Sequence, residues 1–100
     1  MKRIHIAISV TDIEKSVQEY SRRLGVQPDV VIPDEYALWR NEVVNFSVRV
    51  DPSSEKLRHL GWEDDDAASF TKETDCNGIV WERFSAKDQK KEIHAIWPEM

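Results

Sequence analysis

The chain has 100 residues, of which 40% are hydrophobic and 33% charged, and its formal net charge at pH 7 is −5. This length and mixture are typical of one globular domain, whereas the acidic balance argues against a nucleic-acid-binding module. No apolar run reaches the roughly 18–20 residues of a membrane-spanning helix. The N-terminus lacks the pattern of a cleaved signal peptide, and the single cysteine, Cys76, excludes an internal disulfide, so we predict a cytoplasmic protein.

The first quarter of the sequence predicts a strand followed by a helix. Residues 3–10 alternate strictly, with aliphatic side chains on one face and small or polar ones, including His5, on the other. Thr11 and Glu14 have the spacing of a capping box, so a helix is expected to begin there. Gly25 is a typical helix stop, because glycine adopts the left-handed backbone conformation without strain.

A β meander is predicted next, with strands at 28–32, 36–40 and 43–50. On the last of these strands, alternation places Asn45, Ser47 and Arg49 opposite the aliphatic positions. If the sheet is cupped, these three residues line a pocket and are substrate-binding candidates, with Arg49 suited to an anionic substrate group. The alternative is that they form the solvent-facing side of an antiparallel sheet.

The second half begins after a linker predicted at 51–56 and resembles the first half in outline. The stretch 57–63 predicts a strand with His59 on its polar face, 54 residues after His5. Two structures fit the next segment, 64–76. It is either a short helix that begins in the acidic run 63–66, which is how we interpret that run, or a strand that ends in a turn.

The chain is predicted to finish with a strand at 79–84, which contains Glu82, and a helix over 86–97 introduced by a capping box from Ser85 to Asp88. The predicted fold class is therefore α+β. Two βαβββ-type modules, at roughly 1–50 and 57–97, form one curved mixed sheet in a single domain, 1–100. The second module is shortened and the last helix is additional. Such a module leaves sheet edges and apolar surface uncovered, so we expect a homodimer.

Three residues on predicted strands carry chemistry: His5, His59 and Glu82. Two imidazoles and one carboxylate bind a divalent metal and leave positions open for other ligands. Iron, zinc, nickel and manganese all suit this set. The structural alternatives are hydrogen-bonded core histidines and, for Glu82, a charge at a sheet edge or a partner of Arg40, Arg49 or Arg83.

Three stretches together resemble a known superfamily: HIAISVTDIEKSVQEYSRRLGV, RHLGWE and DCNGIVWERF. They are similar to the opening βα unit, the start of the second module and the closing motif of the vicinal oxygen chelate superfamily, which includes glyoxalases, bleomycin-resistance proteins and extradiol dioxygenases. The chain departs from that pattern in the short interval between His59 and Glu82.

The resemblance implies that His5, His59 and Glu82 are metal ligands and that Glu82 has a catalytic role. It implies a metal-dependent enzyme acting on a small molecule by lyase, isomerase or dioxygenase chemistry. The alternative within the same fold is a non-catalytic protein that binds and sequesters a small molecule. A third interpretation, a ferredoxin-like interaction domain, predicts that the three residues lie far apart.

Overall fold

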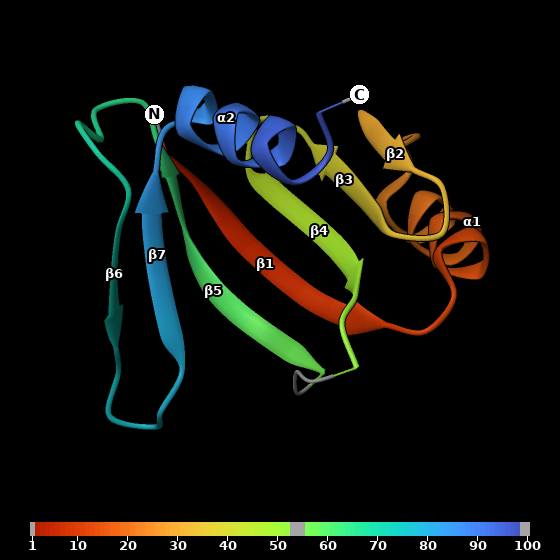
Figure 1. Cartoon of the computed structure of the whole chain (residues 1–100), viewed down its shortest axis with the longest axis horizontal. Coiled ribbons are helices and arrows are strands. Elements are labelled where there is room, and N and C mark those ends of the chain that lie inside the picture. Colours follow the sequence, from red (N-terminus) through yellow and green to blue (C-terminus); the bar gives the residue numbers. More distant parts are fainter. Residues whose placement is uncertain (1, 53–55, 99–100) are drawn as a thin grey trace.

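The computed structural model describes residues 2–52 and 56–98, so residues 53–55 of the predicted linker lie outside the described residues. The described chain forms one sheet and two helices (Figure 1). In chain order the elements are β1 (Lys2–Val10), α1 (Ile13–Leu24), β2 (Val30–Ile32), β3 (Tyr36–Arg40), β4 (Val44–Val50), β5 (Leu57–Asp64), β6 (Thr71–Thr74), β7 (Val80–Phe84) and α2 (Ala86–Ile96). The predicted α+β class is confirmed.

The strand order β2-β3-β4-β1-β5-β7-β6 contains a repeated pairing pattern. In the first half β1 pairs parallel with β4, and β4 pairs antiparallel with β3. In the second half β5 pairs parallel with β7, and β7 pairs antiparallel with β6. The halves join where β1 and β5 run antiparallel at the centre of the sheet. The second half therefore repeats the first without its helix and its outermost strand, as expected from the sequence.

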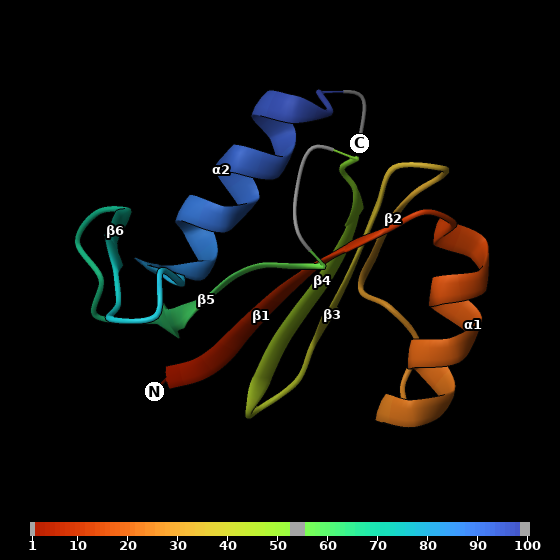
Figure 2. The same cartoon turned by 90° about the horizontal axis from the view of Figure 1, so that it is seen from below.

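Helix α1 covers the convex face of the first half (Figure 2). Its apolar side contributes Ile13 to a core that includes Trp39 and Val48. The N-cap of the helix is Asp12 and not the predicted Thr11, because the Asp12 side chain accepts a hydrogen bond from the Lys15 amide at 3.0 Å. It ends as predicted at Gly25, whose φ is 76°.

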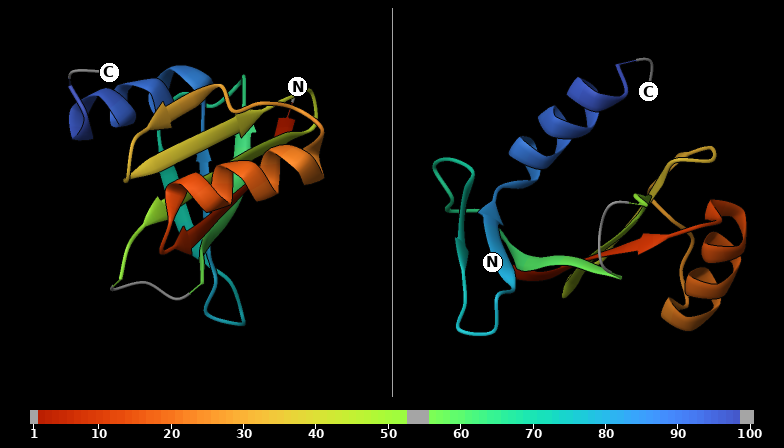
Figure 3. Two further views of the ribbon diagram at one scale, coloured as in Figure 1. Left: turned by 90° about the vertical axis from the view of Figure 1, so that its right-hand side faces the viewer. Right: turned by 60° about the horizontal axis from the view of Figure 1, so that its bottom comes forward.

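Helix α2 lies on the opposite, concave side of the sheet, which curves around it in Figure 3. Ser85 and Asp88 form the predicted capping box. Ile93 packs in a core with Tyr36 and Leu38, and the half-buried Trp97 lies against it. The last helix thus covers the sheet face that carries the predicted site. Neither described helix is long and apolar enough to cross a bilayer.

The segment after β5 is a turn followed by β6, so of the two structures considered for 64–76 the strand is confirmed. The interpretation of the acidic run as a helix start was wrong. Glu63 and Asp64 belong to β5, where Glu63 accepts hydrogen bonds from Arg40 and Asp64 pairs with Arg83 at 3.0 Å. These carboxylates form ion pairs within the sheet and cap no helix.

Candidate metal centre

The registers of three neighbouring strands bring His5 and Glu82 into one row across the sheet. His5 on β1 pairs with Gly61 on β5, and Gly61 pairs with Glu82 on β7. Gly61 has no side chain, and a Cβ placed there would collide with the carbonyl oxygen of Glu82. The glycine therefore permits the close approach of β7 and leaves space above it for the imidazole and the carboxylate.

His59 lies two residues before Gly61 on the same face of β5 and completes the group. Its Nε2 atom is 2.9 Å from Nε2 of His5 and 3.1 Å from Oε1 of Glu82. The three ligand atoms all lie within 4.8 Å of one another. This contradicts the interpretation in which these residues lie far apart. It also gives Glu82 a contact with His59, while Arg40 and Arg83 pair with other carboxylates.

The distances of 2.9 Å and 3.1 Å from Nε2 of His59 fit a shared metal ion. Two ligand atoms that each lie about 2.1 Å from one ion, at right angles, are separated by about 3.0 Å. Without a metal, one hydrogen atom on Nε2 of His59 cannot donate well to both Nε2 of His5 and Oε1 of Glu82. A central cation, by contrast, attracts all three ligand atoms at once. The described His-His-Glu group is therefore compatible with a divalent metal.

A buried polar network orients His5 from behind. The Asn45 amide nitrogen donates to Oε1 of Glu63 at 2.8 Å and to Gln89 at 2.7 Å, which directs its carbonyl oxygen toward Nδ1 of His5 at 2.9 Å. Since the carboxylate of Glu63 only accepts hydrogen bonds, this amide orientation is fixed. Nδ1 of His5 consequently carries the hydrogen, and the lone pair on Nε2 points into the site.

The protonation state of His5 also suits a ligand. Burial lowers the pKa of its imidazole below the usual 6.5, and the neighbouring His59 lowers this pKa further. The Asn45 hydrogen bond opposes these effects without reversing them. His5 is therefore neutral near pH 7, the form in which histidine binds metals.

The group opens into a small pocket of about 60 Å³ between the concave sheet face and α2. Ser47 and Arg49, two of the predicted substrate-binding residues, line this pocket. The third, Asn45, is fully buried behind His5 and supports that histidine. Tyr36 also lines the pocket, and burial raises its pKa to about 12, so its phenol keeps its proton.

Three residues of the site were missed by sequence reasoning: Arg58, Glu63 and Gln89. Arg58 lines the pocket beside His59, although strict alternation sends adjacent residues to opposite faces. Glu63 was assigned to a helix start, and Gln89 was one polar residue among many in the last helix. The one signal in the sequence was the alternation of 57–63, which places Glu63 on the same polar face as His59.

Two other reactive residues lie away from the pocket. His94 is exposed on α2, and Cys76 is free and exposed in the turn between β6 and β7. Neither is among the pocket-lining residues. The cytoplasmic location inferred from the single cysteine stays a prediction.

Comparison with known proteins supports the fold and goes no further. No protein-family model matches the chain, and no curated protein sequence matches it. Among solved structures, the crystal structure of NAD-dependent benzaldehyde dehydrogenase from Legionella pneumophila aligns with a TM-score of 0.60 and 12% sequence identity, over 82% of this chain and 97% of that chain. At this identity the likeness concerns the arrangement of the backbone.

Proposed function

We propose that the protein is a metal-dependent enzyme that acts on a small molecule and binds its metal through His5, His59 and Glu82. The observation that carries this proposal is the convergence of the three ligand atoms within 4.8 Å, at the wall of a pocket. Two histidines that only fill a core do not require a carboxylate next to them. Here Glu82 contacts His59, which also contacts His5. The resemblance to the vicinal oxygen chelate superfamily is part of the same proposal.

The residues that line the pocket have different roles in this proposal. A bound divalent metal would act as a Lewis acid toward an oxygen atom of the substrate. His5 and His59 hold the metal, and Glu82 adds a negative charge and accepts or returns a proton at a carboxylate oxygen. Ile93 of α2 and Trp97, the residue that follows this helix, line the pocket and would limit the access of water. Lyase, isomerase and dioxygenase reactions all use such a site.

Iron, zinc, nickel and manganese are the candidate metals, because imidazole and carboxylate ligands suit each of them. The chain offers two nitrogen ligands and one oxygen ligand and no thiolate at the site, which disfavours metals that require soft sulfur ligands. The identity of the metal is therefore decided by measurement on the protein isolated from its own cells.

The proposal is tested by metal analysis of the purified, untagged protein. Wild-type protein is expected to retain about one transition-metal ion per chain, and His59→Ala is expected to lose it, because His59 contacts both other ligands. His94→Ala is the matched control, since it removes an exposed histidine away from the pocket. Absence of metal from the wild type after incubation with each candidate ion, or equal retention by His59→Ala, contradicts the proposal.

A second function, sequestration of a small molecule without turnover, is favoured by the aromatic lining of the pocket, which includes Tyr36, Phe84 and Trp97. Such a protein needs no metal. Quenching of tryptophan fluorescence by a ligand, in a protein that binds no metal and releases no altered product, identifies this function. The same metal analysis therefore separates the two functions.

A further inference from the structure

We infer that the pocket contains a subsite for an anion beside the candidate metal centre, formed by Arg49 and Arg58, and that the substrate is a small carboxylic acid. The inference rests on the proposed function, which it deepens by naming a class of substrate. Its basis is that both arginines line the pocket that His5, His59 and Glu82 share.

An irregularity in the sheet directs Arg58 into the pocket. Ala7 on β1 pairs with His59, but the next residue, Ile8, pairs with Leu57, so Arg58 is one extra residue on β5. In a regular strand, Arg58 and His59 would point to opposite faces. The bulge turns both toward the same cavity, and bulges commonly redirect side chains next to active sites. The strand thus presents a cation directly beside a predicted metal ligand.

Arg49 approaches from β4, on the face that it shares with Ser47. Its guanidinium group lies over the ring of Trp97, 5.3 Å from the ring centre. Such a cation–π contact does not require the N–H donors of the guanidinium group, which are the part that binds carboxylates in a forked geometry. Arg58 has a carboxylate neighbour, Asp51, at 3.4 Å. That distance exceeds the roughly 2.7–2.9 Å of a tight charge-assisted hydrogen bond.

The charges of the pocket favour an anion once a metal is bound. The positive charges of Arg49 and Arg58 are opposed by Glu82 and Glu92, which also line the cavity, and by Asp51 beside Arg58. A divalent cation then leaves one positive charge without compensation, and a carboxylate substrate supplies the opposite charge. The pocket of about 60 Å³ restricts the bound part of the ligand to a few non-hydrogen atoms.

Cobalt(II) and two small probes test the inference. Cobalt-loaded protein is titrated with oxalate, a small carboxylate, and with imidazole, an uncharged metal ligand, while the cobalt absorption spectrum reports binding. Arg49→Gln and Arg58→Gln are each expected to weaken oxalate binding by about 10- to 100-fold, because each removes a charged hydrogen-bond donor. Both variants should bind cobalt and imidazole as the wild type does. Arg22→Gln, at an exposed arginine of α1, is the matched control.

The outcomes separate this inference from the proposed function. Unchanged oxalate binding in both variants, or equal weakening of oxalate and imidazole, overturns the anion subsite while the metal centre stands. If inorganic phosphate competes with oxalate more strongly than acetate does, the carboxylic acid class is overturned. If the wild type binds neither cobalt nor any of the four candidate metals, the proposed function fails, and oxalate is titrated into metal-free protein with tryptophan fluorescence as the readout. A response that both arginine variants lose then supports the anion subsite, and no response overturns it.

Discussion

Asn45 supports the site from behind, through His5, and is not among the residues that line the pocket. The sequence pattern placed it among substrate-binding candidates, and the fold places it behind His5, fully buried and bonded to Glu63 and Gln89. Its amide nitrogen donates to the Glu63 carboxylate, and its carbonyl oxygen therefore faces Nδ1 of His5. This arrangement determines which nitrogen of His5 carries the hydrogen. Its role in the proposed centre is to position a ligand.

Replacement of Asn45 by alanine is expected to weaken metal binding by about 10- to 100-fold, the usual effect of losing a residue that orients a metal ligand. Affinity is measured by competition of the protein with a chelating dye for zinc. Ser47→Ala, two residues along the same strand face, is the matched control. Equal zinc affinity in Asn45→Ala and the wild type would show that His5 is held by the sheet alone.

At the scale of elements, Glu63 connects four strands beneath the site, because Asn45 on β4 also donates a hydrogen bond to it. It lies on β5 with no exposed surface, and it accepts hydrogen bonds from Arg3 on β1 and from two nitrogen atoms of Arg40 on β3. A carboxylate buried without partners would be strongly destabilising, so the two arginines are what permit its position. The cluster sets the relative placement of the strands that carry His5 and His59.

This cluster makes stability depend on pH. Burial by itself raises the pKa of Glu63, but the hydrogen bonds from Arg40 and Asn45 and the positive charges of Arg40 and Arg3 hold the pKa below its usual 4.5. The folded state therefore gains its full benefit above about pH 4.5. That benefit is lost as the pH falls through this value toward the lower pKa of the folded state, because the unfolded chain takes up the proton first.

Urea unfolding at a series of pH values checks this expectation. Glu63→Gln should lower the free energy of unfolding by about 3 kcal/mol at pH 7, since it leaves two arginines without their partner. The difference from the wild type should shrink between pH 5 and pH 3. Glu42→Gln, at an exposed turn, should follow the wild-type curve. A constant difference across this range would mean that the charge of Glu63 does not stabilise the fold.

Elements with a clear periodicity were predictable, and those defined by distant partners were not. Alternation in β1, β4 and β5 and the capping residues of α2 identified these elements, and the strand patterns placed His5 and His59 on the correct faces. The acidic run was misread because its arginine partners come from β1, β3 and β7. Arg58 was missed because a bulge arises from the register of two strands, which no local pattern of a single strand records.

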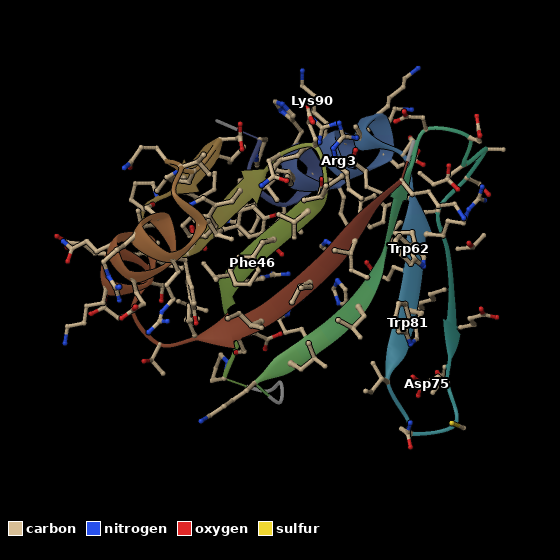
Figure 4. All side chains as sticks on the ribbon, turned by 180° about the vertical axis from the view of Figure 1, so that it is seen from behind. Arg3, Phe46, Trp62, Asp75, Trp81 and Lys90 are labelled. Carbon is tan, nitrogen blue, oxygen red and sulfur yellow. The ribbon has the colours of Figure 1, made fainter. Side chains whose placement is uncertain are left out.

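At the scale of the whole molecule, the missing second helix leaves the convex face of β5 and β7 open. Figure 4 shows Trp62 and Trp81 on this face, and Trp62 is 38% exposed. Charges of both signs lie around them, including Lys2 over the ring of Trp62 and an ion pair between Arg83 and Asp64. In a two-fold symmetric dimer the same patch of both subunits meets, and a face with an apolar centre and charges of both signs around it suits such an interface.

The homodimer expected from the sequence stays a prediction, and this face is where we expect it to form. Sedimentation equilibrium should give twice the 11.7 kDa mass of the chain. Trp62→Glu should give a monomer with an unchanged circular dichroism spectrum, because it places a charge at the centre of the interface. Lys87→Glu, at an exposed position on α2, should remain dimeric. A wild-type monomer at high protein concentration contradicts the prediction.

The central position of β1 also determines when the protein can assemble during its synthesis. β1 is the longest strand, yet its partners β4 and β5 begin only at Val44 and Leu57. Until those residues have been made, both edges of β1 have no strand to pair with, and pairing over such separations is slow. Exposed strand edges promote aggregation, so the growing chain is most vulnerable until β5 has been made. The three candidate ligands come together only after Glu82 has been added.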